Sequence, residues 1–307
     1  MRAVLMSGYG GTEVLQVAEV PDPIAGAGEV VVDIHAASVN AADAKVRAGV
    51  TVYDDMSFPH ILGRDFSGVV STVGDGADLR PGDEVFGVCL RGTDGGYAER
   101  IVIPAAIVAR KPTGIDHTGA AALALAGVTA IYGLEDAGEL HRGQHVLIQG
   151  GAGGVAGFAI QLAKFLGAEV TTTCSANNAD YVTQLGADHV IDYHRTDFTT
   201  LGARFDLVYD TVGGEVQRRS ATVVRPGGRL VYCAPGPEGR SPSRDDIGVI
   251  HPEVRRDRAH LDRVTELVTT GAVRLPTITS FPLDQVADAH RLSESRHLQG
   301  KLVLRMR

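Results

Sequence analysis

The sequence contains no tryptophan and only three cysteines among its 307 residues. Cys89, Cys174 and Cys233 are odd in number and far apart, which argues against the paired spacing of a disulfide framework. This cysteine usage is typical of a reducing compartment. We therefore expect a cytoplasmic protein.

Positive charge is also scarce, because 29 Lys and Arg stand against 37 Asp and Glu, giving a formal net charge of −8. This balance disfavours nucleic acid or an anionic membrane as the main partner. The basic cluster Arg255–Arg258 is interrupted by Asp257, and we expect it to be the solvated start of a helix. No apolar run reaches the roughly 18 residues that a membrane span requires, so we predict no membrane partner.

Glycine is abundant, with 38 residues, and one glycine cluster is especially informative. Residues 145–157 run from an apolar strand through this cluster into a helix with apolar periodicity. Gly151, Gly153 and Ala156 stand at the G-x-G-x-x-A spacing of dinucleotide-binding sites. We expect Gly151 to take the tight turn, Gly153 to admit the pyrophosphate and Ala156 to let the helix pack closely on the strand.

The helix after the glycine cluster is predicted to open toward the pyrophosphate. The first turn of a helix carries unpaired backbone N–H groups and a partial positive charge, which together attract anions. The residues expected to cradle the pyrophosphate are Gly153, Gly154 and Val155.

The residues after the second strand of this region bear on the choice of cofactor. In NAD-selective sites an acid about 20 residues beyond the glycines bonds the ribose 2′-hydroxyl. Here no acid precedes Asp180, so a 2′-phosphate meets no repulsion and we predict NADPH. Ser175 and Asn178 can donate hydrogen bonds to the adenosine ribose or its phosphate. The preference over NADH is expected to be modest unless Arg195 also reaches the phosphate.

Short apolar strands alternate with helical patterns from about residue 143. The predicted strands are His145–Gln149, Glu169–Thr173, His189–Ile191, Phe205–Asp210 and Arg229–Cys233. This alternation predicts an α/β fold with a doubly wound parallel sheet of the Rossmann type. Ligands of such sheets lie beyond the carboxyl ends of the strands, so the cofactor should also meet Thr211, Val212, Cys233 and Ala234.

The first 115 or so residues have a different pattern, with alternating apolar positions and strands punctuated by glycine. This pattern predicts a mostly antiparallel β domain with few helices. A chain of 307 residues favours two domains. A predicted helix at Ala259–Thr269 and a terminal strand at Lys301–Leu304 are expected to return to the first domain and make it discontinuous.

Several blocks in a fixed order resemble the medium-chain dehydrogenase/reductase superfamily, specifically its zinc-independent quinone oxidoreductase branch, which includes zeta-crystallin-like proteins. The blocks include Ala37–Asn40, Phe58–Val70, Gly95–Glu99, Leu125–Ala130, Gln161–Lys164, Leu185–Asp188, Phe205–Asp210 and Gly300–Leu304. The resemblance covers essentially the whole chain. It implies a GroES-like, mostly β catalytic domain at 1–118 and 258–307, a Rossmann domain at 119–257, and a homodimer.

The main departure from the zinc enzymes of this superfamily lies at their metal ligands. Asn40 stands where those enzymes place a cysteine, and Gly63-Arg64-Asp65 stands where they carry Gly-His-Glu. Catalytic zinc needs about three protein ligands plus an open position, and an amide and a guanidinium remove two of them. We therefore predict no zinc, and we expect Arg64 and Asp65 to form a structural ion pair.

The resemblance and the missing ligands together predict the chemistry. Quinones and α,β-unsaturated carbonyls accept hydride without a Lewis acid, because the resulting phenolate or enolate is already a stabilised anion. We predict an NADPH-dependent quinone reductase. The alternatives are an NADPH-dependent alkenal or enone reductase, a non-catalytic NADPH-binding redox sensor, and a zinc alcohol dehydrogenase. We find no Ser–His–acid pattern for hydrolysis.

The resemblance also implies roles for four further side chains. Asn40 is expected to face the nicotinamide ribose or the substrate carbonyl, and Tyr53 to line the substrate cleft with its hydroxyl near the carbonyl oxygen. Thr129 and Tyr193 are expected to contact the cofactor. The proton donor stays open between water and Tyr53.

Overall fold

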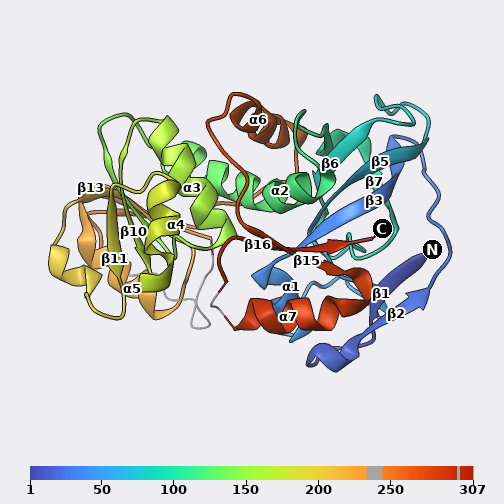
Figure 1. Ribbon diagram of the computed structural model, residues 1–307, viewed down its shortest axis with the longest axis horizontal. Helices are drawn as coiled ribbons and strands as arrows, with labels where there is room; N and C mark the ends of the chain where they lie inside the picture. The colour runs from blue at the N-terminus through green and yellow to red at the C-terminus, as the bar shows by residue number, and fades with distance from the viewer. Residues whose placement is uncertain (234–243, 296–297, 307) are drawn as a thin grey trace. The chain divides into compact units, whose positions relative to one another are not determined.

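The computed structural model describes residues 1–307 apart from 234–243, 296–297 and 307. The chain forms two compact units (Figure 1). Unit 1 comprises Met1–Leu125, Arg256–Thr269 and Leu275–Arg307, and unit 2 comprises Ala126–Arg255 and Thr270–Arg274. Each unit has its own sheet architecture and is described separately.

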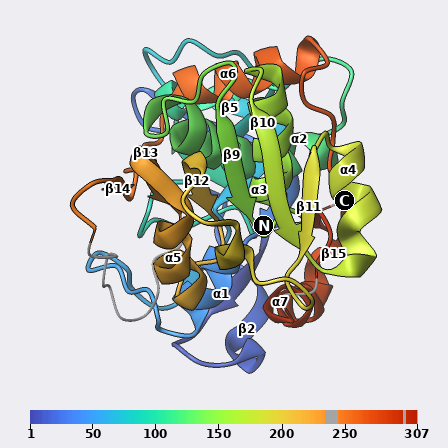
Figure 2. The same ribbon diagram turned by 90° about the vertical axis from the view of Figure 1, so that its left-hand side faces the viewer.

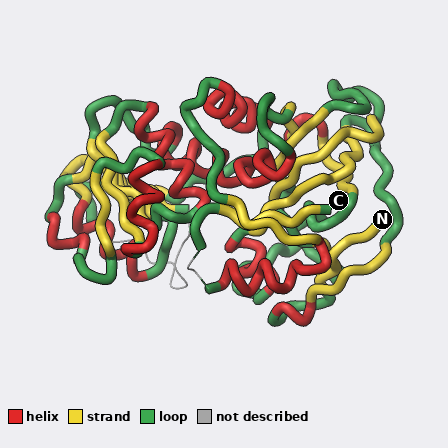
Figure 3. Tube along the Cα trace, viewed as in Figure 1, coloured by secondary structure: helices red, strands yellow, loops and turns green. Residues whose placement is uncertain are grey.

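Unit 1 contains two β-sheets, coloured as strands in Figure 3. The smaller has the order β2-β1-β4, from Leu15–Glu19, Arg2–Met6 and His60–Ile61. The larger has the order β15-β16-β3-β5-β6-β8, with β7 also paired to β3. These strands are β3 (Glu29–Val39), β5 (Asp65–Val73), β6 (Glu84–Val88), β7 (Arg100–Pro104), β8 (Val108–Arg110), β15 (Ile278–Pro282) and β16 (Lys301–Arg305). Among the described strands of this unit every pairing is antiparallel except β15 with β16, which confirms the predicted mostly antiparallel GroES-like fold.

The core of unit 1 lies against strand β3. Its side chains Val30, Val32 and Ile34 are completely buried, as the alternating pattern predicts. Strand β16 pairs antiparallel with β3, with Leu302 opposite Val39. The last strand of the chain therefore completes a sheet begun near its N-terminus. Helices α1 (Ala41–Arg47), α6 (Arg258–Thr269) and α7 (Val286–Glu294) complete this unit.

The basic cluster lies at the start of α6, as predicted, but it is only partly solvated: Arg255 is exposed, whereas Arg256 and Arg258 are half-buried. Arg256 donates from Nε to the carbonyl of Cys89 at 3.1 Å, and Arg258 donates from Nε to the carbonyl of Val108 at 2.8 Å. Asp257 accepts from the His260 N–H at 2.9 Å, the geometry of a helix cap. The cluster anchors the start of α6 to the edge of the sheet.

Unit 2 is built around a six-stranded parallel sheet with the order β11-β10-β9-β12-β13-β14. Figure 2 shows its central strands side by side. The strands are β9 (His145–Gln149), β10 (Glu169–Cys174), β11 (His189–Asp192), β12 (Phe205–Asp210), β13 (Val224–Tyr232) and β14 (Gly248–Ile250). Helices α3 (Gly154–Phe165), α4 (Ala179–Gln184) and α5 (Glu215–Ser220) connect them. This order, with a reversal between β9 and β12, confirms the Rossmann prediction.

Helix α2 (His117–Ile131) continues into a π-helical turn at Tyr132–Asp136. Its 20 residues are long and apolar enough to cross a membrane, so the expectation that no such stretch exists was wrong. However, 89% of the apolar window is buried inside the protein, and a core helix passes the same test. Four of the five residues 120–124 are alanines, and all four are fully buried.

Candidate active site

Three glycines of the loop after β9 have different structural roles. Gly150 has φ +76°, so it and not Gly151 makes the tight turn, which corrects the sequence prediction. A Cβ on Gly151 would lie 2.2 Å from Thr172 Oγ1, so glycine is needed there for close approach to β10. A Cβ on Gly153 would meet only the Gly150 carbonyl, at 3.4 Å. The Gly153 side of the loop is therefore open.

Helix α3 begins directly behind this open side. Its first residue is Gly154, and Gly153 caps it without any side-chain hydrogen bond. The N–H groups of the first turn, including that of Val155, have no partner further back in the helix. Ala156 is fully buried, so its small side chain allows the close packing that was predicted. The loop and helix thus form a backbone cradle that fits an anionic group such as a pyrophosphate.

A network of polar side chains supports the loop. It includes Thr211, which the sequence predicted as a cofactor contact, and Gln149, Thr173 and Asp210, which sequence reasoning missed. Thr173 donates from Oγ1 to Gln149 Oε1 at 2.7 Å and accepts from the Gly150 N–H at 3.1 Å. Thr211 Oγ1 donates to the carbonyl of Gln149 at 2.8 Å. Asp210 is buried, which raises the pKa of its carboxyl, while N–H groups of Val212 and the following glycine donate to it. Polar residues at the ends of otherwise apolar strands were the available signal.

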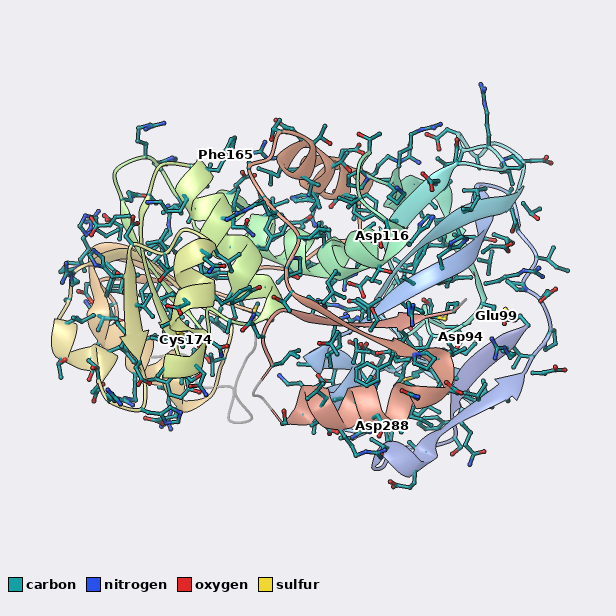
Figure 4. The ribbon with its side chains drawn as sticks, in the orientation of Figure 1. Asp94, Glu99, Asp116, Phe165, Cys174 and Asp288 are labelled. Carbon is teal, nitrogen blue, oxygen red and sulfur yellow. The ribbon has the colours of Figure 1, made fainter. Side chains whose placement is uncertain are left out.

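The predicted adenosine-binding residues lie at the carboxyl ends of β10 and β11. Asn178 Nδ2 donates to Ser175 Oγ at 3.2 Å, so the structure brings these two side chains together just beyond Cys174 (labelled in Figure 4). Tyr193 is 48% exposed beyond β11. The Arg195 side chain is 84% exposed, with Nε 3.6 Å from Asp192 Oδ2.

The remaining predicted cofactor residues have different degrees of exposure. Thr129 is nearly buried, and its carbonyl accepts a hydrogen bond from Tyr209 Oη at 2.9 Å. Val212 is 46% exposed beyond β12, while Cys233 is half-buried and donates its N–H to the carbonyl of Asp210 at 3.1 Å. Ala234 lies outside the described residues.

In unit 1, Asn40 lies between two buried charged groups. Its Nδ2 donates to Asp65 Oδ1 at 3.0 Å, and its Oδ1 accepts from Lys301 Nζ at 2.7 Å. Ser38 Oγ also donates to Asp65 Oδ1, at 2.6 Å. Burial lowers the pKa of Lys301, although Asp65 and Asp43 oppose that effect. These bonds fix the Asn40 amide in one orientation, and Lys301 is a site residue that sequence reasoning missed.

Arg64 and Asp65 do not form the expected ion pair, so that prediction was wrong. Asp65 is bonded to Ser38, to Asn40 and, through Oδ2, to the Leu125 N–H at 3.1 Å. Arg64 donates from Nη1 to the Tyr53 hydroxyl oxygen at 2.7 Å. Arg64 immediately precedes β5, of which Asp65 is the first residue, and the two side chains bond different partners.

Tyr53 and Arg64 line one small pocket of unit 1, together with Asp43, His60 and Arg91. Asp43 Oδ2 accepts from the Asn40 N–H at 2.8 Å and from the Tyr97 hydroxyl at 2.9 Å. Burial raises the pKa of Asp43 to about 6, against the opposing charge of Arg64. The pocket therefore has a phenol, a guanidinium and a titratable acid in its wall.

The rim of this pocket is fixed by Asp94, which is labelled in Figure 4. Asp94 Oδ1 accepts from the Ile61 N–H at 2.9 Å and lies 3.3 Å from His60 Nδ1. Burial lowers the pKa of His60, with Asp94 opposing. The His60 ring thus favours its neutral form.

The structure also bears on two other types of centre, a metal site and a Ser–His–acid site. Across the described ranges, no group of three or more His, Cys, Asp or Glu side chains is arranged to hold a metal ion. A Ser–His–acid contact does exist, contrary to the sequence analysis: Ser67 Oγ lies 2.8 Å from His117 Nδ1, and His117 Nε2 lies 3.3 Å from Glu84 Oε1. However, Ser67 is fully buried and its hydroxyl donates to the Val85 carbonyl, so it is not a nucleophile.

Comparison with known proteins places this architecture in a family. Residues 26–113 match the family described as "Alcohol dehydrogenase GroES-like domain", and residues 185–304 match "Zinc-binding dehydrogenase". An Arabidopsis thaliana protein named "NADPH-dependent alkenal/one oxidoreductase, chloroplastic" is 32% identical, over 99% of this chain and 79% of its own length. The chain belongs to the medium-chain dehydrogenase/reductase superfamily.

Solved structures of this superfamily agree with that assignment. A quinone oxidoreductase from Coxiella burnetii is 31% identical with a TM-score of 0.91, covering 100% of this chain and 99% of the other. An Escherichia coli quinone oxidoreductase complexed with NADPH is 28% identical with a TM-score of 0.89, covering 99% of this chain and 100% of the other. The chain therefore has quinone oxidoreductases among its structural neighbours.

Proposed function

We propose that this medium-chain reductase transfers hydride from NADPH to a quinone or an α,β-unsaturated carbonyl. The observation that carries the proposal is the bond from Arg64 to Tyr53 in unit 1, because Arg64 stands where the zinc enzymes of the superfamily have a metal ligand. Unit 2 contributes the backbone cradle at the start of α3. The similar proteins named for NADPH, quinones and alkenals support the same chemistry.

The residues of unit 2 fit NADPH. The open side of Gly153 and the uncapped start of α3 suit the pyrophosphate. Ser175 and Asn178 offer polar groups to the adenosine ribose, and residues 175–179 contain no carboxylate to repel a 2′-phosphate. Arg195 supplies an exposed cation close by in the chain. We propose NADPH rather than NADH on these grounds.

When bound, the reduced nicotinamide supplies a hydride, which is the difficult part of the chemistry. The residues of unit 1 orient the acceptor. The Tyr53 oxygen accepts from Arg64, so its own O–H remains available to donate to the carbonyl oxygen of an acceptor. The acceptor anion is delocalised, so the site needs a hydrogen-bond donor and dryness more than a metal. We propose that no zinc participates, and that Asn40 keeps its amide fixed beside the acceptor.

Two further proposals concern location and assembly. We propose a cytoplasmic protein, since three cysteines without paired spacing are typical of a reducing compartment. We also propose a homodimer, as the superfamily resemblance implies, since β14 ends the described part of the unit 2 sheet and leaves an edge that a second copy can pair with.

The direct test is the initial rate of NADPH oxidation, measured anaerobically with a chelator present, using an ortho-quinone and an alkenal in parallel. Turnover that persists after chelation supports the metal-free reaction. About one zinc per subunit in elemental analysis would reject it in favour of a zinc alcohol dehydrogenase. Preference for the alkenal identifies an ene reductase. Tight NADPH binding without turnover of either acceptor would favour the redox sensor instead.

A further inference from the structure

Arg64 has an unusual set of neighbours for a guanidinium in a protein interior. Its Nη1 donates to Tyr53 Oη at 2.7 Å, and its Cζ lies 5.8 Å from the centre of the Tyr53 ring. Both side chains line the same pocket of unit 1. The phenol oxygen receives a charge-assisted hydrogen bond, which strengthens Tyr53 as a donor toward a third group.

The charge of Arg64 is not neutralised by an ion pair. Within the described ranges it makes no salt bridge, and its Nε is buried without a hydrogen-bond partner. Asp65, its neighbour in the chain, is occupied by Ser38, Asn40 and a backbone N–H. A buried donor without a partner is costly, so this position favours occupation by an acceptor atom of a ligand or by water.

Other charges around the pocket are mostly positive. Arg91 lines the pocket. Burial lowers the pKa of Arg256 to about 10, and the positive charges of Arg64 and Arg91 contribute to this shift, so Arg256 also lies near the pocket. The opposing groups are Asp94 at the rim and Asp43, whose Oδ1 is buried without a partner. The Asp43 carboxyl has a pKa of about 6 and is only partly protonated near neutral pH. Three guanidiniums therefore face two carboxyl groups, in a chain whose net charge is −8.

We propose that Arg64 is a positioning residue that takes the place of a Lewis acid: it acts through Tyr53 to stabilise the oxyanion of the reduced acceptor. This inference rests on the proposed function. In the reaction, hydride forms a C–H bond at the electron-poor carbon of the acceptor, and the π-electron pair moves to the carbonyl oxygen. That oxygen, now an oxyanion, accepts the Tyr53 O–H hydrogen bond, and one proton from solvent completes the product. The cofactor leaves oxidised by two electrons.

A double-mutant cycle tests whether the two residues act as one unit. Tyr53→Phe removes an oxyanion donor, which typically lowers kcat about 100-fold. Arg64→Met is expected to lower kcat by a similar factor with a small change in the KM for NADPH. The double variant should lose no more than about threefold beyond Tyr53→Phe alone, because Arg64 then has nothing to act through. Losses that multiply, or an Arg64→Met effect confined to KM, would overturn the proposal.

Two further variants keep the cycle interpretable. Arg64→Lys retains a cation without the planar fork, and it should recover part of the kcat lost in Arg64→Met. Arg110→Met removes a guanidinium that is 66% exposed and paired with Asp83 on the surface of the same unit, so kcat should stay within twofold. Equal losses in Arg110→Met and Arg64→Met would show a general charge effect and reject the specific role.

Binding of 4-nitrophenolate gives a readout that needs no turnover. This probe carries a phenolate oxygen like the anion of a reduced quinone, and its absorbance reports binding. Arg64→Met and Tyr53→Phe should each raise its Kd at least tenfold. The double variant should raise the Kd hardly more than Tyr53→Phe alone. If wild type fails to turn over any acceptor but shows this pattern, the proposed function fails and the oxyanion site stands. If wild type turns over and neither variant changes kcat or Kd, the oxyanion site fails and the proposed function stands.

Discussion

Lys301 Nζ lies 2.7 Å from Asn40 Oδ1, although 261 positions separate the two residues in the chain. The ammonium is buried with Asp65 nearby, so it holds the amide from one side while the carboxylate holds it from the other. The orientation of Asn40 is therefore set by a strand at the far end of the chain.

Replacing this lysine should destabilise unit 1. Lys301→Met removes a charged hydrogen bond and leaves Asp65 without a nearby cation, so we expect a loss of about 1.5–3 kcal/mol in the free energy of unfolding. Urea denaturation measures it. The control Lys164→Met breaks a half-exposed ion pair with Asp188 and should cost less than about 1 kcal/mol. Equal costs for the two variants would show that the buried bond adds nothing.

Asp43 should make stability depend on pH. Its carboxyl has an ordinary pKa of 3.8 and a pKa of about 6 when folded, so the folded state binds the proton more tightly. The contribution of Asp43 to stability is therefore fully present below pH 3.8 and is lost as pH rises through about 6. Asp43→Asn removes this term, so the difference in unfolding free energy between wild type and variant should change by up to about 3 kcal/mol across that window. Parallel urea-derived profiles from pH 4 to pH 7 would contradict it.

Alanine substitutions at the two loop glycines should have different effects, one on stability and the other on NADPH binding. Gly151→Ala places a Cβ 2.2 Å from Thr172 Oγ1, so it should lower the melting temperature, and Thr172→Ala in the same chain should restore part of the loss. Gly153→Ala meets only a carbonyl at 3.4 Å, so the fold should persist while the added methyl weakens NADPH binding at least tenfold. Calorimetry and NADPH fluorescence separate the two effects. A Gly153→Ala protein that binds NADPH normally would place the pyrophosphate elsewhere.

Arg195 should affect one cofactor and not the other. If its exposed guanidinium meets the 2′-phosphate, Arg195→Ala should weaken NADPH about 10- to 100-fold, the value of one charged hydrogen bond, and leave NADH within twofold. Both affinities are measured by fluorescence titration. Arg204→Ala, in the loop before β12, is the comparison and should change neither. Equal weakening of NADPH and NADH by Arg195→Ala would rule out phosphate recognition.

The sequence pattern predicted the strands of unit 2 well because each is a short apolar run with a clear end. The bounds His145–Gln149 and Phe205–Asp210 agree with the structure. Strand β13 begins at Val224, five residues before the predicted start at Arg229, since Pro226 and two glycines have the composition of a turn. Its register with β12 shifts there, so the strand continues through residues that resemble a break.

The site was less predictable, because its chemistry depends on contacts between distant segments. Sequence reasoning selected Asn40 and Tyr53, but it paired Arg64 with the acid beside it in the chain. Asp65 is bonded to Ser38 and Asn40, and Arg64 instead bonds a residue 11 positions earlier. Lys301 gave one signal, a lysine directly before the apolar run Leu302–Leu304. Nothing in its own segment indicates that Asn40 is its partner.

The return of β16 to the sheet of unit 1 sets an order of assembly during synthesis. All residues of unit 2, the last of them 270–274, are synthesised before β16. Strand β3 cannot pair with β16 until Lys301–Arg305 has left the ribosome. Unit 2 can thus fold on the nascent chain while unit 1 still lacks a strand and the ammonium that fixes Asn40. A prematurely terminated polypeptide would retain the nucleotide cradle and lack a finished acceptor pocket.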